Sequence, residues 1–163
     1  MRVDSPIGRV VQRVAGSRPF AAVAPKVVPP LDRLVHRLTG GRVIISEGLL
    51  PGMMLTTIGH KSGEPRRVPL ATLPDGDTLV VVASNFGKPH HPAWSTNLLH
   101  HPQATVAYRR QTFPVVAHLL TQEEKAEMWP KLTAMWPVYD RYVERSKRDL
   151  RVFRLERGGS TLP

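Results

Sequence analysis

Hydrophobic and polar residues alternate with a period of two over much of the chain from residue 53 onward. The alternation runs through six segments: "MMLTTIGH", "RRVPLATL", "TLVVVAS", "ATVAYRR", "TFPVVAHL" and "RVFRLE". It is typical of strands, and the links "PDGD" (74–77) and "RRQT" (109–112) predict hairpins. Short strands joined in this way predict an antiparallel sheet that closes, or nearly closes, into a barrel. Pro69 and Pro114 are expected at edges or bulges, because proline cannot donate to a strand ladder.

Helical patterns interrupt the strands in three places. The segment "HPAWSTNLLHHP" (91–102) has Trp94 and Leu98 four residues apart and ends before a proline. The segment "TQEEKAEMWPKLTAMW" (121–136) begins with a Thr121/Glu124 capping box, and "YDRYVERSKRDL" (139–150) forms a further helix. The predicted fold class is therefore α+β, mainly β, with helices flanking an antiparallel barrel.

The first 42 residues differ from the rest. Residues 1–30 are rich in arginine and proline, and we expect a partly flexible arm there. The segment "LDRLVHRLTGG" (31–41) places four apolar residues at helical spacing, which predicts a short amphipathic helix: Leu31, Leu34, Val35 and Leu38. It either covers the core or lies on a membrane surface, and packing is the favoured role. We divide the chain into a basic arm, 1–42, and a main domain, 43–163.

Composition adds a strong positive charge. The formal net charge is +10, and residues 1–40 hold seven Lys and Arg against two Asp. Such an excess favours an anionic partner, namely nucleic acid, lipid headgroups or a phosphorylated cofactor, although simple solubility is the alternative. The absence of cysteine excludes disulfides and thiolate metal sites, and no apolar run approaches the ~20 residues of a membrane span. We expect a cytoplasmic protein.

The stretch "TTIGHKSGEPRRVPL" (56–70) gathers cations beside a tight turn. A strand that ends in Gly-x-Lys-Ser-Gly can turn its amides outward as an anion nest, to which Lys61 and Ser62 add a charge and a hydroxyl. Arg66 and Arg67 point to opposite faces of the returning strand, so one of them reaches the same pocket as Lys61. The spacing is not that of a P-loop. The alternative is a solvated hairpin with scattered charges.

Two further stretches carry candidate chemistry. In "VVVASNFGKPHHPAWSTNL" (80–98), Ser84 and Asn85 end a strand that is apolar on both faces, and a helix starts close by, which suits a planar ligand. The alternative is that Trp94 belongs to the core and that the hydroxyls after it only cap the helix. In "AMWPVYDRYVE" (134–144), three aromatic residues at spacings of three form either a pocket wall or part of the core: Trp136, Tyr139 and Tyr142. The pairs His90–His91 and His100–His101 lack ligand-like spacing, so no metal site is expected.

The motifs "LTTIGHKSGEPRRVPL", "DGDTLVVVASNFG…HPAWSTNL" and "MWPVYDRY" together resemble those of the deazaflavin-dependent nitroreductases. That family belongs to the split β-barrel flavin and deazaflavin oxidoreductases, and the resemblance covers about residues 43–157. It implies a split barrel that binds coenzyme F-420, an 8-hydroxy-5-deazaflavin with a phosphate and a polyglutamate tail. It also implies hydride transfer from the reduced cofactor to a quinone, or to a nitroaromatic or nitroimidazole compound.

The resemblance implies a role for each candidate. The anionic tail would be bound by His60, Lys61, Ser62, Arg66 and Arg67. The body of the cofactor would lie against Val68, Pro69, Leu70, Ala83, Ser84, Asn85, Ala93, Trp94, Ser95, Thr96 and Asn97, with Tyr139 closing over the ring. Ser84, Tyr139 or Tyr142 would stabilise charge or relay a proton, and Trp136 would join the two tyrosines in the substrate pocket.

The chain departs from the family pattern at three places. His60 replaces an arginine, Asn85-Phe86 replaces a basic residue and glycine, and Trp136 stands where tyrosine is common. Three alternatives remain open: a split-barrel enzyme that binds FMN, a basic nucleic-acid-binding module, and a cofactor carrier without turnover. We expect no nucleic-acid partner, a monomer or weak homodimer, and peripheral contact of residues 25–38 with the inner face of the cell membrane.

Overall fold

The sheet follows from the alternation of residues along its strands. The computed structural model describes residues 50–158, together with Val14, Ser17, Pro19, Val23, Lys26 and Val27. Within this part seven strands form one antiparallel sheet in the order β2-β1-β5-β6-β7-β4-β3. The strands are β1 (Gly52–Ile58), β2 (Pro65–Ala71), β3 (Leu73–Asp75), β4 (Thr78–Val82), β5 (Gln103–Tyr108), β6 (Gln111–Leu119) and β7 (Val152–Arg157). All six predicted strands are present, and the antiparallel sheet is confirmed.

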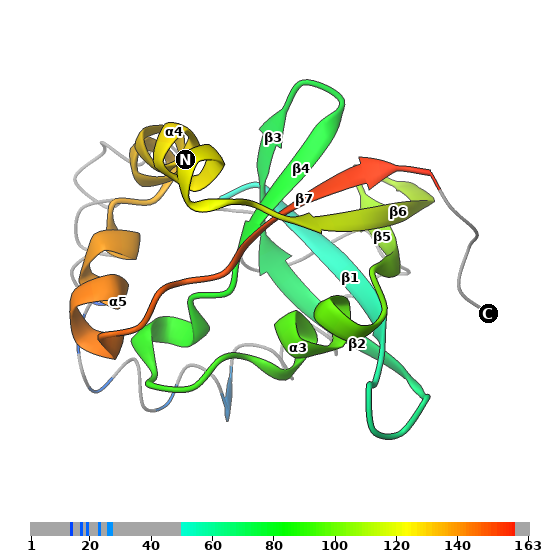
Figure 1. The fold of residues 1–163 in the computed structure, drawn as a ribbon, viewed down its shortest axis with the longest axis horizontal. Helices are drawn as coiled ribbons and strands as arrows, with labels where there is room; N and C mark the ends of the chain where they lie inside the picture. Colours follow the sequence, from blue (N-terminus) through cyan, green and yellow to red (C-terminus); the bar gives the residue numbers. More distant parts are fainter. Residues whose placement is uncertain are drawn as a thin grey trace.

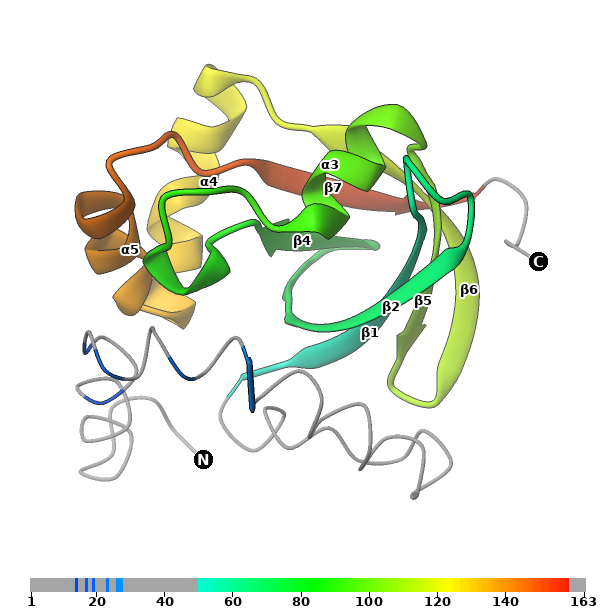
Figure 2. The same cartoon turned by 90° about the horizontal axis from the view of Figure 1, so that it is seen from below.

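The two edge strands of the sheet are consecutive in the chain. Only Thr72 separates β2 from β3, so the predicted strand over 66–73 is in fact two strands at opposite ends of the sheet order. Thr72 is fully buried; its amide donates to the Pro51 carbonyl (2.8 Å) and its hydroxyl to the Val80 carbonyl (3.1 Å). This residue therefore joins the two edges and curls the sheet into a barrel (Figures 1 and 2).

Both predicted hairpins form. Gly76 adopts φ +60° in the β3–β4 turn, and Arg109 and Arg110 adopt φ 47° and 65° between β5 and β6. Positive φ at both central residues matches the twist of the flanking strands. Pro69 lies in edge strand β2, as predicted. Pro114 does not lie at an edge: it is in the internal strand β6, where the pairing with β7 ends.

Helices cover the sheet in two places. They are α3 (Ala93–His100), α4 (Gln122–Met135) and α5 (Val138–Ser146), with a short 3₁₀ turn η2 (Asn85–Gly87) before α3. Helices α4 and α5 lie together at one side of the sheet, and α3 lies apart from them near β1 and β2 (Figure 1). The predicted capping box is present at the start of α4, with both hydrogen bonds between Thr121 and Glu124. None of the helices in the described residues is long and apolar enough to cross a membrane.

Two cores result from the alternation along β4 and β7. Leu79, Val81 and Phe153 face the barrel interior, whereas Val80 and Val152 face α4 and α5. The strand that reads as apolar on both faces is therefore buried on both. The amphipathic helix predicted over 31–38, and most of the basic arm, lie outside the described residues.

Candidate functional site

The β1–β2 turn is held by its own amides. The Gly59 amide donates to the Glu64 carbonyl (2.8 Å), the Gly63 amide to the Gly59 carbonyl (2.7 Å), and the Glu64 amide to the Ser62 hydroxyl (3.3 Å). A Cβ at Gly59 would lie 2.5 Å from the Ser62 hydroxyl, so a larger residue there would displace that hydroxyl. The prediction of an anion nest is therefore wrong for these amides, because they donate within the protein rather than toward a ligand.

The cations of this turn have no ion-pair partner within residues 50–158. Lys61, Arg66 and Arg67, here called the cationic strip, are exposed, and no ion pair found within residues 50–158 includes any of them. Arg66 Nη2 donates to the Ser62 hydroxyl (3.3 Å). Arg66 shares the face of Val68, which packs against the barrel core, and Arg67 faces the other way. Exposed cations such as Lys61 and Arg66, without an ion pair among the described residues, are suited to an extended anion.

Asn97 fastens the turn to α3. Its Oδ1 accepts from the His60 amide (3.1 Å) and contacts His60 Nδ1 (3.0 Å), and its Nδ2 donates to the Thr57 hydroxyl (3.0 Å). The His60 ring also stacks on His100 with centroids 5.1 Å apart. Both polar atoms of this buried amide therefore bond protein groups, and Asn97 supports the turn that carries the cations.

The loop from Ala83 to His91 is strained. Asn85, Phe86 and Gly87 adopt φ 46°, 55° and 73°, a left-handed run that is unfavourable for the two residues with side chains. Asn85 Nδ2 donates to the His90 carbonyl (3.0 Å), which closes the loop on itself. Strain of this kind clusters at binding and catalytic sites. Ser84, half-buried, directly precedes η2 and lies two residues after the end of β4.

Two arginines outside the predicted site bond the loop and α3, respectively. Arg148 donates to loop carbonyls, and Arg151 Nη1 donates to the hydroxyls of Ser95 and Thr96 (3.3 Å each). Burial and the charges of Arg151 and Arg148 lower the pKa of His91. No local pattern marks either arginine, because their partners lie 55 to 65 residues away in sequence.

The remaining residues at the start of α3 have mixed surroundings. Trp94 is buried in the barrel core against Phe153, with ring centroids 5.9 Å apart, so the core interpretation applies to it. The Ser95 hydroxyl donates to the Pro92 carbonyl (2.8 Å). Ala93, the first residue of α3, is exposed. On strand β2, Pro69 is half-buried, and Val68 and Leu70 pack against the barrel core.

The aromatic residues near the C-terminus do not form one face of a single helix. Trp136 ends α4, whereas Tyr139 and Tyr142 belong to α5. All three side chains are buried in the second core, and the Trp136 side chain hydrogen-bonds the Tyr142 hydroxyl. Burial raises the pKa of Tyr142 to about 12 and raises that of Tyr139 further. Of the two interpretations, the core one applies to these three side chains in this structure, and the phenols keep their protons at neutral pH.

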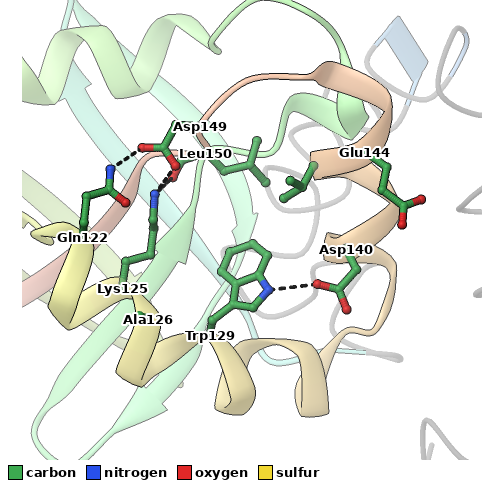
Figure 3. Close-up of a pocket in the computed structure, with 9 residues that line it drawn as sticks. Gln122, Lys125, Ala126, Trp129, Asp140, Glu144, Asp149 and Leu150 are labelled. Carbon is green, nitrogen blue, oxygen red and sulfur yellow. Dashed lines mark hydrogen bonds and ion pairs between the residues drawn. The ribbon is translucent and has the colours of Figure 1, made fainter.

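A pocket of about 500 Å³ lies between α4 and α5 (Figure 3). The predicted site residues do not line it. Its polar lining is mostly paired, since Asp149 bonds both Gln122 and Lys125, and the Trp129 indole donates to Asp140 (2.9 Å). Across the described part of the chain, no cluster of three His, Asp or Glu side chains could hold a metal ion.

Comparison with known proteins identifies the group to which this geometry belongs. The family model for F420H(2)-dependent quinone reductases matches residues 32–157. The chain belongs to this family. It is thus an oxidoreductase, and its cofactor is coenzyme F-420.

Members of the family with known sequences or structures align over most of the chain. An F420H(2)-dependent quinone reductase of Mycobacterium tuberculosis is 29% identical over 136 residues, covering 78% of this chain and 88% of that protein. The solved structure of an F420-H2 dependent reductase (FDR-A) is 33% identical, with a TM-score of 0.60, and covers 65% of this chain and 94% of that one. A second structure, described as a domain-swapped dimer, is 29% identical, with a TM-score of 0.63, and covers 78% and 94%. The split-barrel fold implied by the resemblance is confirmed, and so are the cofactor and the class of enzyme.

Proposed function

We propose that this quinone reductase binds F-420 between the cationic strip and the 83–91 loop, and reduces a quinone there. The observation that carries the proposal is the cationic strip itself. Three cations stand on one turn and its strand, exposed, and outside every ion pair of the described residues. A phosphate followed by several carboxylates would neutralise Lys61 and Arg66, whereas Arg67 lies on the opposite face of the strand.

The donor chemistry fits the cofactor that the family uses. Lysine and arginine bind phosphate and carboxylate oxygens, and arginine does so with two parallel bonds. FMN carries one phosphate and would leave most of the strip unpaired. The supporting residues also fit, because Asn97 and Ser62 hold the turn that presents the cations.

The cofactor body would lie along half-buried positions of two segments. These are Val68, Pro69 and Leu70 on β2, and Ser84, Asn85 and Thr96 from the loop and α3. F-420, when reduced and bound, supplies a hydride, and the protein supplies its orientation relative to the acceptor. The exposed Ala93 permits close approach at the start of α3.

Ser84 is the best-placed group for contact with a reacting acceptor. It is half-buried two residues after the end of β4, whereas Tyr139 and Tyr142 are buried in the second core. The raised pKa values of the tyrosines make them hydrogen-bond donors rather than bases. We propose that the Ser84 hydroxyl donates to the acceptor oxygen as negative charge develops there. The tyrosines, buried in the second core, would support the 83–91 loop.

A quinone is the favoured acceptor, and a nitroaromatic compound is the second. Trp136, where tyrosine is common in the best-known nitro-activating members, is buried and bonds Tyr142, so this position offers no hydroxyl to a nitroaromatic acceptor. Contact of the arm with a quinone-containing membrane stays a prediction, as does a monomer or weak homodimer. The domain swap is a property of the relative described above.

The test is turnover with a defined electron count. Reduced F-420 is mixed with a water-soluble naphthoquinone without oxygen, and the return of the oxidised cofactor is followed by absorbance. We expect one quinone reduced per F-420 oxidised, with Ser84→Ala slower at saturating cofactor. Reduced FMN and a nitroimidazole serve as the alternative donor and acceptor. Turnover no faster than without protein would indicate a cofactor carrier rather than an enzyme. Equal turnover with reduced FMN would contradict the cofactor assignment.

A further inference from the structure

Each nitrogen of the Arg148 guanidinium group contacts the 83–91 loop. Its Nη2 donates to the carbonyls of Ala83 (3.0 Å) and Ser84 (2.7 Å), and its Nε donates to the Lys88 carbonyl (3.0 Å). Its Nη1 lies 2.9 Å from His91 Nδ1. Because a guanidinium group can only donate, Nδ1 must accept, which places the proton of neutral His91 on Nε2. None of the ion pairs in the described part of the chain includes Arg148.

These bonds bracket the strained part of the loop. Asn85, Phe86 and Gly87 are the left-handed residues, and the carbonyls bound by Arg148 lie just before and just after them. A left-handed run that includes side chains persists only where its surroundings fix it. Helix α5 supplies a second support, since Arg145 Nη1 donates to the Phe86 carbonyl (3.4 Å).

The segment that carries Arg148 is itself fixed from the other side. Asp149, the next residue, faces α4, where it bonds Gln122 Nε2 (2.7 Å) and forms an ion pair with Lys125 (Figure 3). Leu150 is buried in the second core. Arg148 bonds the 83–91 loop and Asp149 bonds α4, so these two adjacent residues link the loop to α4.

We propose that Arg148 is a positioning residue, which holds residues 83–91 in the strained shape that presents Ser84 and Asn85 to the cofactor. The inference rests on the proposed function, because it assumes that F-420 lies against this loop. It assigns a role to a residue that touches neither cofactor nor acceptor. Lysine cannot replace it, because one ammonium group cannot reach acceptors on both sides of the strained turn.

The experiment compares Arg148→Lys and Arg148→Ala with Arg141→Gln, an exposed arginine on α5. Amide hydrogen exchange is measured without cofactor for residues 83–91 and, as reference, for β5. F-420 affinity and the absorption spectrum of the bound ring are then measured by titration. Both Arg148 variants should exchange at least tenfold faster in the loop but not in β5, and bind at least tenfold more weakly. At saturation, their bound spectra should move toward that of the free cofactor, whereas Arg141→Gln matches the wild type.

Wild-type loop exchange and affinity in the Arg148 variants would overturn the proposal. Should Arg148→Ala fail to fold, His91→Ala removes a single acceptor and leaves the arginine in place. Faster loop exchange in that variant supports the positioning role of Arg148, and unchanged exchange overturns it. The exchange measurement needs no cofactor, so it separates the two proposals: wild-type protein that does not bind F-420 would overturn the proposed function instead.

Discussion

Replacing Asn97 with alanine should destabilise the protein and release the basic turn. The Asn97 side chain is 4% exposed and makes three contacts, to the His60 amide, to His60 Nδ1 and to the Thr57 hydroxyl. Each such bond contributes about 1 kcal/mol net, and the fully buried Thr57 hydroxyl would lose its partner. We therefore expect a loss of about 3 kcal/mol in the free energy of unfolding, or about 6–12 °C in Tm for a protein of this size.

The assay is urea unfolding at 25 °C, with Leu99→Ala as the matched control. Leu99 lies on the same helix but is 45% exposed, so its replacement should change stability by less than about 0.5 kcal/mol. Thr57→Val alone and with Asn97→Ala completes a double-mutant cycle. The two changes remove the same bond, so their effects should fall short of additivity by about 1 kcal/mol. A loss below about 1 kcal/mol for Asn97→Ala, or strict additivity, would refute the role given to Asn97.

Two further predictions each concern one side chain. The Tyr108 hydroxyl is buried without a hydrogen-bond partner, so Tyr108→Phe should stabilise the protein by about 1 kcal/mol in thermal unfolding, and a loss of stability would contradict this. The pKa of His91 is lowered by burial and by Arg151 and Arg148, so the unfolded chain takes up its proton first as the pH falls below about 6.5. Stability should therefore decrease from pH 7 to pH 5. His91→Asn, which keeps an acceptor but does not titrate, should remove that part of the decrease in urea unfolding, and an unchanged pH dependence would show that another group is responsible.

Local patterns predicted most of the fold. Alternation found the strands, the sequence Asp-Gly at 75–76 found one hairpin, and Thr121 with Glu124 found the start of α4. These features depend on neighbours within a few residues, which a sequence displays directly. The break between β2 and β3 at Thr72 could not be predicted from neighbouring residues. It depends on barrel closure, in which the Thr72 hydroxyl bonds the carbonyl of Val80 on another strand.

The candidate site was predicted less completely than the fold. Charge and spacing marked Lys61 and Arg66, but they could not show that the amides of Gly59 and Gly63 are already used within the turn. The spacing of Trp136, Tyr139 and Tyr142 suited a pocket wall as well as a core. Only the packing of α4 against α5 shows that these side chains belong to the core. No local pattern marks Arg148. The sequence predicts a helix that continues over 139–150, whereas α5 ends at Ser146 and Lys147 adopts φ 53°.

The central claim is that the cationic strip binds the anionic tail of F-420. The most direct test is a fluorescence titration of oxidised F-420 with wild-type protein, Lys61→Ala and Arg66→Ala. Arg110→Ala is the control, because Arg110 is exposed in a turn at the opposite end of β1, roughly 20 Å away at 3.3 Å per residue. The two strip variants should each bind about three- to tenfold more weakly, an effect that shrinks as salt is added, and the control should match the wild type. Equal affinity in all four proteins would contradict the claim.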